Sequence, residues 1–276
     1  MDPFDHVAEI VRAADRDRYL ADLFAPQSKR RHLLALHAFN AEIARVRQNV
    51  TEPGLGEIRL QFWRDAVRGD GAGHPVGQAL VETIAKFSLP FEAFDRLIEA
   101  RRFDLYDDPM PSLNDLEGYA GETSSSLIQM AAILLAGGRD PGMAEIAGHG
   151  GVAYALTGLM QALPIHASRG QTYLPADLLS AHQVDRAEML VGHSSPELLA
   201  ALAELRSVAR SHLAAARKLA DGLDPGLFAA VLPLALVEPQ LRAMERPGSE
   251  PFGIGTGPSQ FRRQWILWRA AVKRVF

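Results

Sequence analysis

Cysteine is absent from all 276 residues of the sequence. Its absence excludes disulfide scaffolds, thiolate zinc sites, iron–sulfur clusters and cysteine nucleophiles. The chain also lacks a glycine loop for phosphates, a pair of metal-binding histidines on one helix and a Gly-x-Ser-x-Gly turn. His149 and His166 are not spaced to share a metal ion. The residue pattern therefore predicts no metal site and none of the familiar catalytic sites.

A strong excess of charge of either sign is missing too. The formal net charge is −4, and 22% of the residues are charged against 47% hydrophobic, which is the composition of a soluble globular protein. This balance argues against nucleic acid as a partner. Residues 1–20 have neither the apolar core of a signal peptide nor the acid-poor character of a transit peptide. We therefore expect residence in the cytoplasm.

No stretch shows the sustained alternation of apolar and polar residues, bounded by hairpin turns, that marks a sheet. Apolar residues instead recur at helical spacing, which predicts an all-α fold. The expected helices cover residues 7–24, 28–50, 55–68, 76–87, 91–106, 113–136, 177–184, 196–223 and 227–244. Ser28 is expected to cap the second of them. No break in composition divides residues 1–276 into separate domains.

The stretch 150–175, GGVAYALTGLMQALPIHASRGQTYLP, predicts a buried helix that ends in a polar, basic turn. Small residues such as Gly151 and Gly158 allow the helix to approach its neighbours closely. Pro164 then removes a backbone donor, and His166 and Arg169 follow within five residues. Three interpretations stay open: an anion-binding turn, a core helix with a polar cap, and a membrane span over residues 146–168, for which several Gly, two His and a Pro are poor material.

Two further charge patterns bear on the surface. Asp104, Asp107 and Asp108 precede Pro109, and we expect them to form a solvated helix end. Near the C-terminus the sequence places apolar residues on one helical face and cations on another, as in a basic helix at a membrane surface. The alternative is a last core helix whose arginines cover apolar surface. The apolar positions are Phe261, Trp265, Trp268, Val272 and Val275, and the cations are Arg262, Arg269 and Lys273.

Four blocks carry a resemblance to a known family. They are HLLALHAFNAEIARV, HPVGQALVETIAKFSLPFEAFDRLIEARRFDL, LEGYAGETSSSLIQMAA and GLMQALPIHASRGQTYLPADLL, with QWILWRAAVKRV as the last helix. The sequence resembles the squalene/phytoene synthases, the head-to-head prenyl synthases. The resemblance implies one squalene/phytoene synthase-like domain over residues 1–276, with the isoprenoid synthase fold and helices around a deep central cavity.

Active members of that family hold magnesium with two aspartate-rich motifs, because this ion needs hard oxygen ligands. The resemblance places the first motif at residues 44–48 and the second at residues 162–166, where this chain has no carboxylate. Together, LHAFNAEIARV, RLQFWRDAV, YAGETSSSL and ALPIHASRG resemble a non-enzymatic branch that includes a mitochondrial assembly factor for respiratory complex I.

The resemblance implies a catalytically degenerate protein that assists assembly of a membrane respiratory complex, with no cofactor and no catalytic residue. Its partner would be a subunit or assembly protein of that complex, or an isoprenoid or other lipid. The alternative is an active prenyltransferase acting on prenyl diphosphates, and only this alternative requires magnesium. Since a metal clamp supplies several kcal/mol of transition-state stabilisation, the missing carboxylates favour the first hypothesis.

We expect a positively charged, ligand-binding end of the cavity that holds anions without metal. Its positions lie on helix faces that the family resemblance turns inward. They are Arg45, Gln48, Tyr119, Thr123, Gln161, His166 and Arg169. The protein is expected in the cytoplasm or peripherally on the inner face of the cytoplasmic membrane, in contact through its C-terminal helix.

Overall fold

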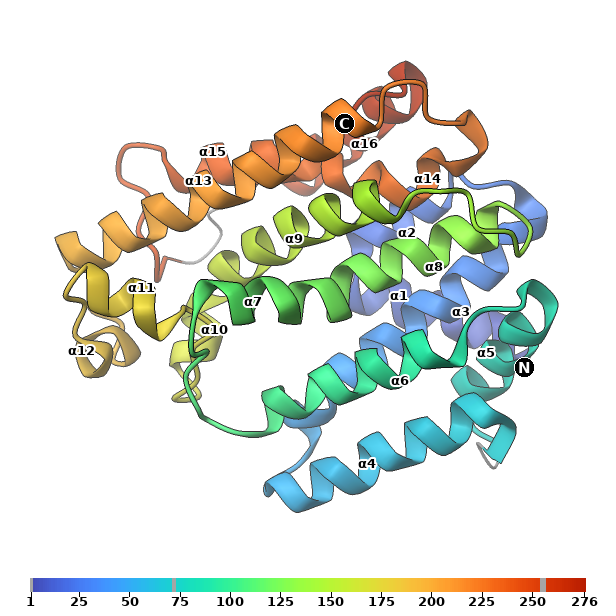
Figure 1. Ribbon diagram of the computed structural model, residues 1–276, viewed down its shortest axis with the longest axis horizontal. Coiled ribbons are helices and arrows are strands. Elements are labelled where there is room, and N and C mark those ends of the chain that lie inside the picture. Colours follow the sequence, from blue (N-terminus) through green and yellow to red (C-terminus); the bar gives the residue numbers. More distant parts are fainter. Residues whose placement is uncertain (1, 71–72, 254–256) are drawn as a thin grey trace.

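The computed structural model describes residues 2–70, 73–253 and 257–276. Every regular element within these ranges is a helix, which confirms the all-α prediction. Figure 1 shows the long helices side by side, with α13 along one edge and α4 along the opposite edge. The short helices α10, α11 and α12 gather at one end of the bundle.

The N-terminal elements confirm most of the predicted helices but divide some of them. They are α1 (Pro3–Ala14), α2 (Arg16–Asp22), α3 (Gln27–Ala44), η1 (Val46–Asn49), α4 (Pro53–Asp65), η2 (Ala66–Asp70), α5 (Pro75–Phe87), α6 (Phe91–Ala100) and η3 (Arg101–Leu105). The predicted helix 7–24 breaks at Asp15, whose carboxylate accepts a hydrogen bond from the Arg18 amide at 3.0 Å and so caps α2. Ser28 is not a cap, because α3 begins after Pro26.

The remaining elements include two short helices, α10 and α12, that the periodicity does not predict; α10 occupies part of the expected polar turn after the central helix. They are α7 (Leu113–Ala120), η4 (Gly121–Ser125), α8 (Ser126–Leu135), α9 (Ala144–Gln161), α10 (Leu163–Ala167), α11 (Ala176–Ala181), α12 (Arg186–Leu190), α13 (Pro196–Leu219), η5 (Pro225–Leu227), α14 (Phe228–Val231), η6 (Leu232–Leu236), α15 (Val237–Met244) and α16 (Gln260–Lys273). The predicted helix 113–136 contains the π-helical turn η4, a rare feature that is often found at functional sites.

The predicted central helix is α9, which packs against α13, α8 and η4. A Cβ atom at Gly151 would lie 2.4 Å from the backbone nitrogen of Ser125, so only glycine permits this approach. The same construction at Gly158 meets nothing within 4 Å. The prediction of close helix packing is therefore confirmed at Gly151 and wrong at Gly158.

A single hydrophobic cluster of buried side chains extends from Phe4 to Phe276. The stretch Pro225–Met244 is long and apolar enough to cross a membrane, but 72% of its most apolar window is buried inside the protein. In this structure the stretch is part of the core, packed through α14 and η6 against α8, α2 and α9.

Candidate functional site

A buried carboxylate, Asp104 of η3, organises the polar end of the bundle where α9 passes into α10. Asp104 is only 6% exposed. The phenol hydroxyls of Tyr119 and Tyr173 donate to its Oδ1 atom at 2.7 and 2.6 Å. The guanidinium of Arg101 donates to Oδ2 at 3.1 Å and to the Tyr119 hydroxyl at 2.7 Å. Both carboxylate oxygens are therefore occupied by partners from three separate segments.

The expectation of a solvated helix end is wrong for Asp104 and confirmed for Asp107 and Asp108, which are exposed. Asp104 follows the buried Leu97 by seven residues and Arg101 by three, so it continues the inward face of α6. Asp107 and Asp108 come after η3 has ended, so the helical register no longer applies to them.

Two segments hold the tyrosines in place. Tyr119 lies on the last turn of α7, just before η4, and the Thr123 hydroxyl donates to its carbonyl oxygen at 2.7 Å. Tyr173 lies in the extended chain after α10. The Gln171 side-chain amide of that segment donates to the Asp104 carbonyl oxygen at 3.1 Å, so the segment is held against η3. We call Arg101, Asp104, Tyr119, His166 and Tyr173 the Asp104 cluster.

His166 joins this cluster through its ring. Its centroid lies 4.7 Å from that of Tyr173. Burial lowers the pKa of His166 to about 4; Asp104 opposes this shift and Arg169 adds to it. The imidazole is therefore neutral at pH 7 and contributes no positive charge to the site. Burial raises the pKa of Tyr119 and of Tyr173, with the charge of Asp104 adding to both shifts, so these phenols stay protonated.

The other predicted site residues occupy different positions. Arg45 is half-buried where α3 ends, and Gln48 is exposed on η1, which packs beside η3. Arg47 of η1 lies 3.6 Å from Asp107 in an ion pair that ties these two turns together. Arg169 is exposed, near enough to His166 to influence its charge. Gln161 instead adjoins Gly257, beside the guanidinium of Arg263 on α16.

The structure thus brings Tyr119, Thr123 and His166 together, and it adds Arg101, Asp104 and Tyr173, which were not among the predicted site residues. Tyr173 lies in the stretch 150–175, where no local pattern indicates a role for it, and Arg101 and Asp104 have the local sequence environment of surface charges. Their long-range pairing decides their burial.

The donor set at this end does not fit a magnesium–diphosphate cluster. Positions 44, 45, 48, 162 and 166 carry Ala, Arg, Gln, Ala and His, none of which offers an anionic oxygen. Asp104, the buried carboxylate nearby, already accepts bonds from two phenols and a guanidinium. Across the described ranges, no group of three or more His, Asp or Glu side chains is arranged to hold a metal ion.

A second polar network lies deeper, among α2, α3 and α9. The Asp22 carboxylate contacts His37 Nδ1 at 2.7 Å, and Asp15 contacts Arg18 at 2.6 Å. The Arg18 guanidinium lies 4.8 Å from the centroid of the Tyr154 ring. Arg18, His37 and Tyr154 line a cavity of about 10 Å³, closed on its other sides by α8, α14 and η6. Such a space holds about one water molecule and no prenyl chain.

Comparison with known proteins gives consistent matches. A family model described as squalene/phytoene synthase matches residues 11–269. The chain is 32% identical to rat NADH dehydrogenase (ubiquinone) complex I, assembly factor 6, over 242 residues, which are 86% of this chain and 72% of that one. Identity to the human protein of the same name is 30% over 247 residues, covering 88% and 74%. A phytoene synthase of Thermus thermophilus is 26% identical over 206 residues, covering 73% and 69%.

Solved structures share the fold at lower identity. A dehydrosqualene synthase in complex with ligand has a TM-score of 0.84 at 18% identity, covering 99% of this chain and 96% of that one. A squalene synthase from Alicyclobacillus acidocaldarius has a TM-score of 0.78 at 22% identity, covering 91% and 95%. These matches confirm the isoprenoid synthase architecture expected from the sequence.

Proposed function

The chain belongs to the squalene/phytoene synthase family, and we propose that it is a catalytically silent member that assists assembly of respiratory complex I by binding a protein partner. Its relatives from rat and human, at 32% and 30% identity, are named as assembly factors of that complex. The phytoene synthase match is weaker, at 26% identity. The pattern of similarity supports assembly over synthesis.

The proposal rests on the hydrogen bonds of Asp104, since both of its carboxylate oxygens already have partners within the protein. A prenyl synthase ionises an allylic diphosphate, and the departing charge has to be neutralised by metal ions or by cations placed around it. At this end of the bundle the carboxylate of Asp104 already accepts hydrogen bonds from Tyr119, Tyr173 and Arg101. The Asp104 cluster therefore has a structural role. It holds in place the segments that form the surface at α10, η1 and η3.

The partner is proposed to be a protein in preference to an isoprenoid in the interior. The enclosed cavity beside His37 has a volume of about 10 Å³, whereas ligand pockets usually measure roughly 300–1,000 Å³. At this end of the bundle Arg45 is half-buried, and Gln48 and Arg169 are exposed. We propose that these polar side chains meet the assembly partner instead of an anionic ligand.

Contact with the inner face of the cytoplasmic membrane is proposed through α16. Its apolar stripe points away from the core: Phe261 is 81% exposed, and Trp265 and Trp268 are 53% and 49% exposed. Only Leu267 and Ala270 of this helix are buried. A core helix would bury such a stripe, so its exposure favours the interfacial interpretation over that of a covered last helix.

Deletion of the gene in its source organism tests the function. We expect less fully assembled NADH dehydrogenase complex on native gels, with restoration by the full chain and unchanged prenyl products. Complementation by Arg45→Glu together with Arg169→Glu should be weaker, while the exposed control pair Arg59→Glu and Arg139→Glu should complement fully. Normal complex levels combined with lost squalene or phytoene would instead establish the prenyltransferase alternative.

A further inference from the structure

A large groove lies beside the C-terminal turns of α13. In Figure 1 these turns are at the opposite end of α13 from α11 and α12. The groove is bounded by the C-terminal turns of α13, by α15 and by α16, and its volume is about 1120 Å³. Its lining is amphipathic. Phe228, Trp265, Ile266 and Phe276 supply apolar surface, and the rest is dominated by long cationic side chains.

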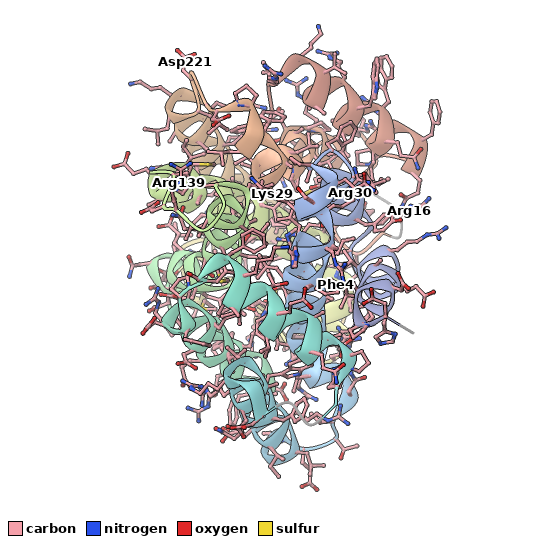
Figure 2. The ribbon with its side chains drawn as sticks, turned by 90° about the vertical axis from the view of Figure 1, so that its right-hand side faces the viewer. Phe4, Arg16, Lys29, Arg30, Arg139 and Asp221 are labelled. Atoms are coloured by element: carbon pink, nitrogen blue, oxygen red, sulfur yellow. The ribbon has the colours of Figure 1, made fainter. Side chains whose placement is uncertain are left out.

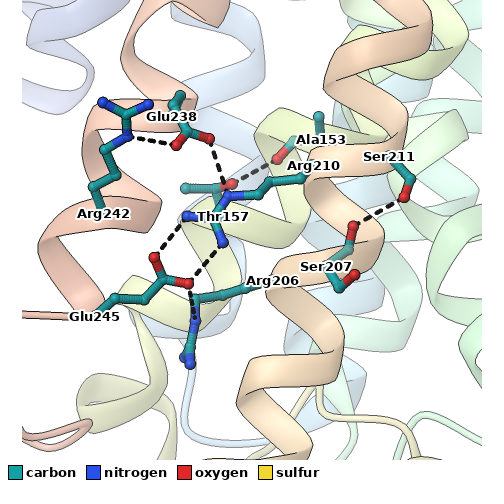
Figure 3. Close-up of polar contacts among 9 residues, drawn as sticks. All are labelled: Ala153, Thr157, Arg206, Ser207, Arg210, Ser211, Glu238, Arg242 and Glu245. Atoms are coloured by element: carbon teal, nitrogen blue, oxygen red, sulfur yellow. Dashed lines mark hydrogen bonds and ion pairs between the residues drawn. The ribbon is translucent and has the colours of Figure 1, made fainter.

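The groove carries far more positive than negative charge. Eight Lys or Arg side chains line it against two side-chain carboxylates, Asp221 and Glu238. Glu238 is already engaged, since Arg210 Nε contacts one of its oxygens at 3.1 Å and Arg242 Nε the other at 2.7 Å (Figure 3). Asp221 is exposed at the outer end of α13 (Figure 2).

Three of the cations that line the groove come from α16. Arg262, Arg269 and Lys273 lie on the groove side of this helix, one residue along from its apolar stripe. Within the described ranges no carboxylate lies within ion-pair distance of any of the three. Charges of one sign gathered in a concave surface raise the local concentration of counter-ions.

Arg217 lines the groove from the α13 side. Its Nε donates to the main-chain oxygen of Phe276 at 2.6 Å, so the guanidinium is held against the last residue of the chain. Burial lowers the pKa of Arg217; the charge of Glu238 opposes this shift, and the charge of Arg242 adds a smaller effect in the same direction as burial.

We propose that this groove binds the phosphate headgroup of an anionic phospholipid while the stripe of α16 lies in the membrane surface. The inference rests on the membrane contact proposed above and adds a specific headgroup site to it. Groove and stripe share α16, so one orientation of the protein satisfies both. A membrane fits better than an acidic protein, because Trp265 and Trp268 are the residue type enriched at membrane interfaces and both are about half exposed.

The test is flotation of the full chain with two kinds of vesicle, phosphatidylcholine alone and an equimolar mixture with phosphatidylglycerol. The groove variant is Arg262→Gln, Arg269→Gln and Lys273→Gln, all at exposed positions. Its matched control is Arg12→Gln, Arg59→Gln and Arg139→Gln, which removes the same charge from exposed positions elsewhere. We expect the groove variant to bind mixed vesicles at least tenfold more weakly, since each cation near the surface contributes about fivefold.

The outcomes separate this inference from its premise. Equal binding of wild type to both vesicles, or equal weakening by the groove variant and its control, overturns the headgroup site but leaves the α16 contact in place. If the wild type binds neither kind of vesicle at low salt, both the headgroup site and the α16 contact are overturned. Trp265→Ala with Trp268→Ala should weaken binding to both vesicles. Unchanged urea unfolding of each variant establishes that lost binding is not lost folding.

Discussion

The hydroxyl of Tyr173 donates to Oδ1 of Asp104 at 2.6 Å, across a separation of 69 residues. This bond joins the segment after α10 to η3, and Tyr119 reaches the same oxygen from α7. Three parts of the chain therefore converge on one buried carboxyl group, which accepts hydrogen bonds from Arg101 and from both phenols.

Removing this charge is expected to destabilise the protein strongly. Asp104→Asn leaves the largely buried Arg101 without a counter-charge, and breaking a buried pair in this way costs about 3–5 kcal/mol of the free energy of unfolding. Asp107→Asn, in an exposed pair with Arg47, should cost less than about 1 kcal/mol. Urea unfolding measures both. Equal effects of the two variants would contradict the role assigned to Asp104.

His166 should make stability depend on pH in the acidic range. Its folded pKa of about 4 lies below the ordinary value of 6.5, so the unfolded chain binds the proton first as the pH falls. The contribution of His166 is therefore complete above pH 6.5 and is lost between pH 6.5 and about 4, with a slope of at most ~1.4 kcal/mol per pH unit. His166→Asn should show a shallower loss than wild type in urea unfolding across this window. Parallel curves for the two proteins would show that His166 titrates normally.

Two glycines of α9 should respond to alanine in opposite directions. Gly151→Ala places a methyl group against the Ser125 backbone and should lower the free energy of unfolding by about 1–3 kcal/mol. Gly158→Ala meets open space in the same helix and should raise it by about 0.5–1 kcal/mol, because alanine loses less backbone entropy. Thermal and urea unfolding check the signs, and destabilisation by both changes would disprove the close approach at Gly151 as the cause.

Purified protein should not convert farnesyl or geranylgeranyl diphosphate to hydrocarbon, even with excess magnesium. The positions that would hold the metal carry Ala44, Arg45, Gln48, Ala162 and His166, and every ~1.4 kcal/mol lost at ionisation slows the reaction tenfold. Radiolabelled substrates followed by chromatography provide the measurement. Turnover to squalene, phytoene or a cyclopropyl intermediate, lost on Arg45→Ala or His166→Ala, would refute the non-catalytic proposal.

Local sequence signals predicted the helices well because apolar periodicity reports a buried face directly. These signals failed where one helix ends and the next begins. Asp15 interrupts the first helix with φ −140° and ψ 77°, although its neighbours keep helical spacing. At Arg45 the α-helix gives way to a 3₁₀ turn while the apolar series continues to Val46. Such breaks depend on capping and packing contacts that periodicity does not contain.

The candidate site was predictable only in part, for a related reason. Tyr119, Thr123 and His166 lie where the family resemblance turned them inward. The burial of Asp104 depends on Tyr119 and Tyr173, which lie 15 and 69 residues further along the chain.

The arrangement of the three tryptophans gives the protein a built-in optical reporter. Trp63 is 4% exposed and packs edge-on against Phe39, whereas Trp265 and Trp268 stack on the surface with ring centroids 5.2 Å apart and planes inclined by 24°. The fluorescence of the unlabelled chain thus combines one shielded indole with a coupled, water-facing pair. Transfer of α16 into an apolar phase should shift the emission of that pair to shorter wavelength, while the signal of Trp63 stays constant as an internal reference.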